Sequence, residues 1–234
     1  MIELTLGIVI AAALADSINP CVFGVLIFLL AYMTAVFKNK NKMLIAALIY
    51  VSAVYITYLL LGIGVFTLAY TAGFAKPFYW FAAIVAVIAG LFEIKDYFWY
   101  GKGFSLQIIP GGVERVKKYI KILKKMGAKH TSLSLLISFL IGVLVVFVEL
   151  PCTGAPYFAI LGLLSSGDYS SGIPLLLLYN LIFILPLFVI IGFVYIGKKS
   201  RVMEKWRKKY RGLMRLLIGL FLLALGAYML WAVV

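Results

Sequence analysis

Charged residues are scarce in this chain, and so are cysteine, histidine and proline. Of 234 residues, 13% are charged and 65% are hydrophobic, whereas a typical soluble domain has about 25% charged residues. The mean hydropathy of +1.11 leaves more apolar surface than a soluble 26 kDa globule can hide from water. The shortage of charge therefore excludes a soluble enzyme, a disordered chain and a disulfide-stapled secreted domain. It indicates a protein whose remaining apolar surface is covered by a lipid bilayer.

Acidic residues are scarcer than basic ones, and the net charge is +14. Of 22 basic residues, 21 lie in three alternate polar segments, at 38–42, 95–129 and 198–215, and only Lys76 lies elsewhere. Basic segments mark the cytoplasmic side of membrane proteins. The pattern predicts a multi-pass membrane protein with both termini outside. It explains the charge as a topology signal, so no nucleic-acid partner is expected.

Apolar stretches long enough to cross the hydrocarbon core, which takes about 20 residues, occur six times. They are Leu4–Phe37, Met43–Tyr70, Pro77–Ile94, Thr131–Leu164, Ile173–Ile196 and Leu213–Val233. The fold class predicted is an all-α polytopic membrane protein with six transmembrane helices. The start of the chain lacks a basic segment typical of a signal peptide, so the first span is expected to stay in the mature protein.

The first and fourth stretches are each 34 residues long, which is about 50 Å of helix for a core about 30 Å thick. Each contains a polar, helix-breaking interruption, at Asp16–Cys21 in the first and at Glu149–Pro156 in the fourth. Proline lacks an N–H and clashes with the preceding helical turn. We therefore predict that the first and fourth helices are broken at Pro-Cys.

The two cysteines of the chain, Cys21 and Cys152, both follow a proline and lie 131 residues apart. Shifting the chain by that interval lays the first three spans on the last three. A three-span unit has its ends on opposite sides of the membrane, so its copy must be inverted. The sequence thus predicts one membrane domain made of two inverted three-helix repeats, at about 1–100 and 131–234, with a functional site near the midplane.

The segment between the repeats, at about 101–130, is basic. Within it, residues 112–126 have the apolar spacing of an amphipathic helix at the cytoplasmic interface. Such a helix either reinforces the topology or docks a partner.

The Pro-Cys pairs have a chemical consequence if each opens a half-helix. Asn19, Pro20 and Cys21 then read as the N-cap and the first two helical positions, where the helix dipole favours the thiolate. Pro151 and Cys152 repeat this pattern with a poorer cap before them. The two thiols are thus either a dithiol/disulfide couple or two small buried apolar side chains.

Asp16 and Glu149 are interpreted as the only acids deep within spans, close in sequence to Cys21 and Cys152. Intramembrane acids suggest function. Either could exchange a proton with a thiol, or Asp16 could simply cap amides at the helix break. In the fifth span, Asn180 and Pro186 are expected to give a hydrogen-bonded, kinked helix rather than chemistry.

No cluster of His, Cys and Asp suggests a transition-metal site, the single histidine, His130, is assigned no role, and no glycine-rich phosphate loop is present. No cofactor and no metal are expected.

These features resemble the CcdA cytochrome c biogenesis family and the transmembrane domain of the thiol-disulfide interchange protein DsbD. The resemblance covers essentially the whole chain. It depends on Asn19-Pro20-Cys21, on Pro151-Cys152-Thr153-Gly154 and on Tyr179 to Pro186. Family members often have proline three residues after each cysteine, where this chain has Gly24 and Ala155, with Pro156 one place later.

The resemblance implies a thiol-disulfide oxidoreductase of a prokaryotic cell membrane. In it, cytoplasmic thioredoxin reduces a Cys21–Cys152 disulfide, and the dithiol then reduces extracytoplasmic thioredoxin-like proteins, which supports cytochrome c maturation. Two alternatives stay open. One is a small inverted-repeat transporter of an ion or amino acid with Asp16, Glu149 and Asn180 as ligands. The other is a scaffold for haem-lyase assembly.

Overall fold

The structure is a computed structural model that describes residues 2–19, 22, 39–99, 131–165, 169–196 and 200–232. Within these ranges every regular element is an α-helix. The helices are α1 (Ile2–Ser17), α3 (Lys40–Thr71), α4 (Ala75–Phe98), α6 (Thr131–Ser165), α7 (Tyr169–Tyr195) and α8 (Ser200–Trp231). Five of them contain a segment long and apolar enough to cross a membrane, and α1 is a shorter apolar helix. The predicted all-α class with multiple candidate membrane helices is confirmed for this part of the chain.

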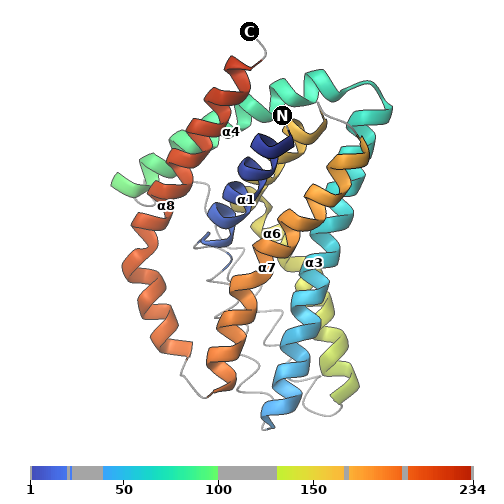
Figure 1. Ribbon diagram of the computed structural model, residues 1–234. Coiled ribbons are helices and arrows are strands. Elements are labelled where there is room, and N and C mark those ends of the chain that lie inside the picture. The colour runs from blue at the N-terminus through green and yellow to red at the C-terminus, as the bar shows by residue number, and fades with distance from the viewer. Residues whose placement is uncertain are drawn as a thin grey trace.

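Successive helices run in alternate directions through the bundle (Figure 1). In that view α3, α6 and α8 run upward, whereas α1, α4 and α7 run downward. The start of α1 and the end of α8 consequently lie at the same end of the bundle. This arrangement is the one expected for six crossings, and which end faces the cytoplasm stays a prediction from the basic residues.

Several helix contacts join the first three helices of the chain to the last three. α1 packs against α7 and α3 against α6, α4 packs against α6 and α1 against α8, and two further contacts join α4 to α8 and α3 to α7. Exchanging α1, α3 and α4 with α6, α7 and α8 respectively interchanges the α1–α7 and α3–α6 contacts and maps α4–α8 and α3–α7 onto themselves. It pairs the large α4–α6 contact with the small α1–α8 contact, and the small α6–α7, α6–α8 and α3–α4 contacts have no counterpart of their size. The larger contacts are therefore compatible with two related halves, and the inverted repeat stays a prediction.

The boundaries of α3 have local causes. At its start the Asn39 side chain accepts a hydrogen bond of 2.9 Å from the backbone N–H of Asn41, which satisfies a free amide of the first turn. After its end Gly73 has a φ of +69°, a left-handed conformation in which glycine has no Cβ penalty. A short turn then leads directly into α4.

Glycine allows α4 and α8 to pack closely. A Cβ built on Gly90 would lie 2.9 Å from the carbonyl oxygen of Gly219, and one on Gly219 would lie 2.8 Å from the side chain of Ile94. At the other end of the pair, the hydroxyl of Tyr79 donates a 2.9 Å hydrogen bond to the carbonyl of Met229. Small residues at such contacts are typical of membrane helices, which associate through close packing.

The predicted interruption of the fourth span is wrong for the backbone, because α6 continues as one 35-residue helix through Pro151 and Cys152. Proline removes only its own N–H bond, and the apolar surroundings favour keeping the rest of the helix bonded. Nearby, Thr153 donates a 3.1 Å hydrogen bond back to the carbonyl of Glu149, a bond that bends a helix more readily than it ends one.

The sixth span begins earlier than predicted. α8 starts at Ser200, so the basic residues from Arg201 to Arg211, which were expected to precede the span, are helical. Glu204 contacts Arg207 at 3.0 Å and Lys208 at 3.3 Å, one turn further along the helix. Such pairs support a helix that hydropathy alone does not predict.

Some predictions lie outside the described residues. These are the second half of the first span, including Pro20 and Cys21, the amphipathic helix at 112–126, and His130. α1 ends at Ser17, shortly before Pro20.

Candidate functional site

The two Pro-Cys motifs adjoin buried polar residues. After α1 ends, the backbone N–H of Asn19 donates a 3.0 Å hydrogen bond to the carbonyl of Asp16, and both side chains are buried. Residues 151 and 152 are part of the α6 backbone, between Glu149 and Thr153, and these two flanking side chains are buried as well. Each motif is thus adjacent in sequence to polar side chains that are buried inside the protein.

Asp16 is held from the other half of the chain. The hydroxyl of Tyr179, on α7, donates a 2.9 Å hydrogen bond to Oδ2 of Asp16. Both residues are 1% exposed. A hydrogen bond of this kind fixes the orientation of a carboxyl group that is shielded from water.

Thr153, on α6 in the second half of the chain, is contacted by a residue from the first half. The hydroxyl of Tyr58, on α3, bonds Oγ1 of Thr153. Because the Thr153 hydroxyl donates to the Glu149 carbonyl, Tyr58 is the donor in this bond. Each half therefore supplies one tyrosine to a helix of the other half: Tyr179 bonds α1, which ends shortly before the first motif, and Tyr58 bonds α6, which contains the second.

Tyr157 and Asn180 join these two contacts. The Tyr157 hydroxyl donates a 2.7 Å hydrogen bond to the carbonyl of Tyr58 and accepts one of 3.3 Å from Nδ2 of Asn180. Its ring centroid lies 5.6 Å from that of Tyr58 and 5.4 Å from that of Tyr179. Asn180 thus hydrogen-bonds across a helix interface, as expected.

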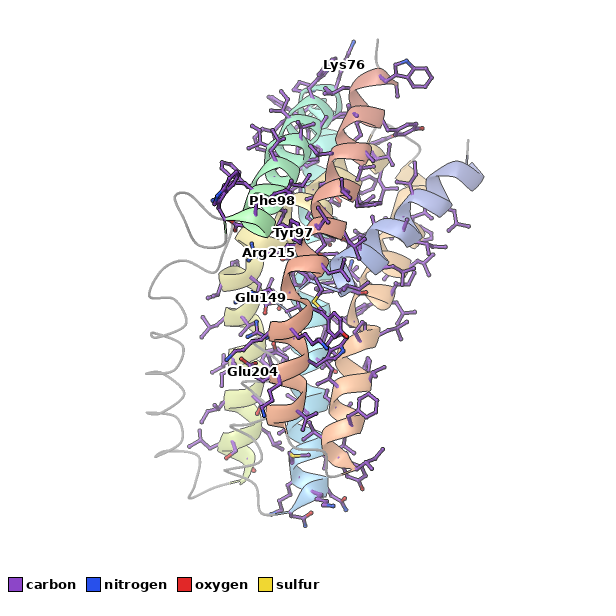
Figure 2. All side chains as sticks on the ribbon, turned by 90° about the vertical axis from the view of Figure 1, so that its left-hand side faces the viewer. Lys76, Tyr97, Phe98, Glu149, Glu204 and Arg215 are labelled. Atoms are coloured by element: carbon purple, nitrogen blue, oxygen red, sulfur yellow. The ribbon has the colours of Figure 1, made fainter. Side chains whose placement is uncertain are left out.

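We call these residues the polar cluster. It comprises Asp16, Asn19, Tyr58, Glu149, Thr153, Tyr157, Tyr179 and Asn180, and none is more than 3% exposed. Its members come from α1 and the turn after it, α3, α6 and α7. Figure 2 places Glu149 between Lys76 at one end of the bundle and Glu204 towards the other.

Within the polar cluster, the acceptor atoms Oδ1 of Asp16 and Oδ1 of Asn180 have no hydrogen-bond partner among the described residues. Buried acceptors usually have one, so this site has capacity for a further donor such as a thiol, water or an added proton. No group of three or more His, Cys, Asp or Glu residues in the described part of the chain could hold a metal ion.

A second buried polar group lies between α4 and α8. Arg215 is 2% exposed and contacts Oδ2 of Asp96 at 2.6 Å and Oε2 of Glu93 at 3.4 Å, while Lys95 contacts Asp96 at 2.9 Å. Glu93 and Asp96 are thus buried as well as Asp16 and Glu149, while the interpretation that the latter two are the only acids deep within spans stays a prediction. Glu93 and Asp96 follow a long apolar run, so hydropathy places them at its end, while packing against Arg215 buries them.

Of the other predicted site residues, Gly154 and Pro156 are buried in α6, and Pro186 is half-buried in α7, which continues through it. The side chains of Pro151 and Cys152 lie outside what the structure describes.

Sequence reasoning missed Tyr58, Thr153 and Tyr157 as parts of the site. A signal was present in Tyr58 and Tyr157, because tyrosines far from the ends of apolar stretches need a hydrogen-bond partner inside the protein. The identity of that partner requires the tertiary structure.

Comparison with protein families gives a match to the transmembrane region of cytochrome c biogenesis proteins over residues 8–228. The chain belongs to this family. The match spans both Pro-Cys motifs and every member of the polar cluster. Comparisons with curated proteins and with solved structures give no match.

Proposed function

We propose that this family member is a thiol-disulfide oxidoreductase of the cell membrane. It carries reducing equivalents from cytoplasmic thioredoxin to extracytoplasmic thioredoxin-like proteins, which keep apocytochrome c thiols reduced. A reversible disulfide between Cys21 and Cys152 is the carrier. The strongest support is the polar cluster, because its buried residues lie next to both Pro-Cys motifs in the sequence of an apolar protein of this family.

The reaction is two successive disulfide exchanges. A thioredoxin thiolate attacks one sulfur of the Cys21–Cys152 disulfide, and a mixed disulfide forms as the other sulfur leaves as a thiolate. The second thioredoxin thiol resolves the mixed disulfide, which oxidises thioredoxin and leaves two thiols on the membrane protein. The dithiol then reduces the outside partner in the same way, so two electrons pass and the carrier returns to the disulfide.

The architecture proposed is two inverted repeats, with 101–130 between them. The exchange of helix contacts between the halves supports this arrangement. So do the two crosswise tyrosine contacts, from Tyr58 to α6 and from Tyr179 to α1. A site at the junction of such repeats can be presented to one side of the membrane and then to the other.

The first prediction concerns the two thiols, which are the only cysteines in the chain. In each single variant, Cys21→Ser or Cys152→Ser, the remaining thiol cannot be resolved internally. Each variant is expected to lose electron transfer entirely. At least one of them should trap thioredoxin, and at least one an outside thioredoxin-like protein, as mixed disulfides on non-reducing gels.

The variant with both cysteines replaced is the control and should give no adduct. Absence of any adduct on either side of the membrane would overturn the electron-carrier proposal. Retained biological activity in the double variant would instead favour a transporter that uses Asp16, Glu149 and Asn180, or an assembly scaffold.

A further inference from the structure

Asp16 lies five residues before Cys21, in a place where its carboxylate is shielded from water. One oxygen is fixed by the hydroxyl of Tyr179, whereas Oδ1 has no hydrogen-bond partner among the described residues. A fixed carboxylate with one oxygen left over is suited to accept or donate a proton. A residue that only capped helix amides would instead use that oxygen on backbone N–H groups.

The titratable groups around Asp16 come from three other helices. They are the phenols of Tyr58 on α3, Tyr157 on α6 and Tyr179 on α7. A phenol gives up its proton only in strongly basic solution, so none of the three is a base at neutral pH. Among these four groups, only the carboxylate can take up a proton there.

We propose that Asp16 exchanges a proton with the sulfur of Cys21, and that Tyr179 is the positioning residue that orients the carboxylate. This inference rests on the proposed function and names the proton-handling groups of the same site. Tyr179 belongs to the second proposed repeat, whereas Asp16 and Cys21 belong to the first.

Asp16 donates its proton to Cys21 when the disulfide is reduced and recovers it when the disulfide forms again. When a reductant thiolate attacks the sulfur of Cys152, the S–S bond breaks, and Cys21 leaves and receives the proton of the Asp16 carboxylic acid. The second reductant thiol then attacks the mixed disulfide and becomes part of the reductant's own disulfide, and its proton passes to Cys152, which leaves as a thiol. When Cys21 later attacks a disulfide of the outside partner, the Asp16 carboxylate takes the proton back and one partner sulfur leaves as a thiolate. Cys152 then attacks Cys21 to re-form the disulfide, and its proton passes to the second partner sulfur, so the membrane protein neither gains nor loses a proton over the cycle.

The test is the pH dependence of disulfide reduction in the full-length protein, with dithiothreitol as the reductant. The fraction reduced is followed by alkylation and mass. Reduction needs the reductant thiolate, which increases with pH, and protonated Asp16, which decreases with pH. The unaltered protein is therefore expected to give a bell-shaped rate profile.

Asp16→Asn is expected to lower the maximal rate about 100-fold and to remove the falling limb, since general acid catalysis contributes about 10²- to 10⁴-fold. Tyr179→Phe should keep the bell shape and move the falling limb about one pH unit to higher pH, because the bond that stabilises the carboxylate form is lost. A merely structural tyrosine would change the rate without moving the limb.

Tyr79→Phe is the matched control, because Tyr79 is another buried tyrosine whose hydroxyl donates to a backbone carbonyl, far from the polar cluster. Its profile should match that of the unaltered protein. The inference is overturned if Asp16→Asn keeps the falling limb, if Tyr179→Phe does not move it, or if Glu149→Gln removes it instead. Failure to form any Cys21–Cys152 disulfide would refute the proposed function itself and is seen before reduction begins.

Discussion

Gly62 on α3 makes room for a hydroxyl group of the polar cluster. A Cβ placed on Gly62 would collide with the hydroxyl of Tyr157, which donates to the carbonyl of Tyr58 and accepts from Asn180. The absence of one methyl group thus allows a buried tyrosine to bridge α3 and α7. The polar cluster therefore depends on Gly62, a residue without a side chain.

Gly62→Ala is therefore expected to destabilise the protein. Displacing the Tyr157 hydroxyl should cost about 1–3 kcal/mol, as overpacking in a dense core does. The better helix propensity of alanine returns only about 1 kcal/mol. Thermal unfolding in detergent measures the difference.

Gly64→Ala is the matched control on the same helix, because nothing lies within 4 Å of a Cβ there. It should be neutral or slightly stabilising. Equal unfolding temperatures for the two variants would contradict the role assigned to Gly62.

Helix α8 combines two environments in one element. Its first turns carry exposed basic residues near Glu204, and further along the same helix Arg215 is buried against the end of α4. Figure 2 shows Arg215 beside Tyr97 and Phe98, which mark that end. The two acids of α4 compensate the charge of Arg215, so a basic side chain can lie inside a helix pair packed through glycine.

Arg215→Met is expected to destabilise the protein by about 3–5 kcal/mol, because it leaves Glu93 and Asp96 buried without their arginine. Unfolding in detergent micelles tests this. Adding Asp96→Leu should recover part of the loss, since an apolar pair of similar size avoids the desolvation cost.

Lys209→Met, at an exposed position on the same helix, is the control and should change stability little. If Arg215→Met unfolds at the same temperature as this control, the buried ion pairs do not hold α4 to α8.

The whole molecule is organised by the distribution of basic residues along the chain and by alternate helix directions. α3 starts at the end of the bundle where α7 finishes, and the hydroxyl of Tyr195 donates a 3.2 Å hydrogen bond to Oδ1 of Asn41 there. The turn between α3 and α4 lies at the opposite end (Figure 1). The basic residues predict that the first of these ends faces the cytoplasm.

Orientation can be read by labelling single cysteines introduced into the variant that lacks Cys21 and Cys152. Lys40 and Phe74 are exposed and lie at opposite ends of α3. Phe74→Cys should react with a membrane-impermeant maleimide in intact cells, and Lys40→Cys only after lysis. The opposite pattern would show that the protein is inserted the other way round.

Much of the fold follows from hydropathy, because a run of apolar residues in lipid has few alternatives to a helix. The predicted Met43–Tyr70 and Thr131–Leu164 agree within a few residues with α3 and α6. The start of α8 does not follow from hydropathy, because basic residues paired with Glu204 are helical without being apolar. The continuity of α6 through Pro151 was missed because proline weakens a helix without necessarily ending it.

The sequence by itself determined the class of the protein, the number of apolar stretches and the proposed reactive residues, because each follows from composition and short-range spacing. It also carried enough information to assign the family. The tertiary structure decided which polar groups meet. Tyr179 reaches Asp16 and Tyr58 reaches Thr153 across 163 and 95 residues. Contacts between residues so distant in sequence depend on how helices pack, and no local pattern specifies that.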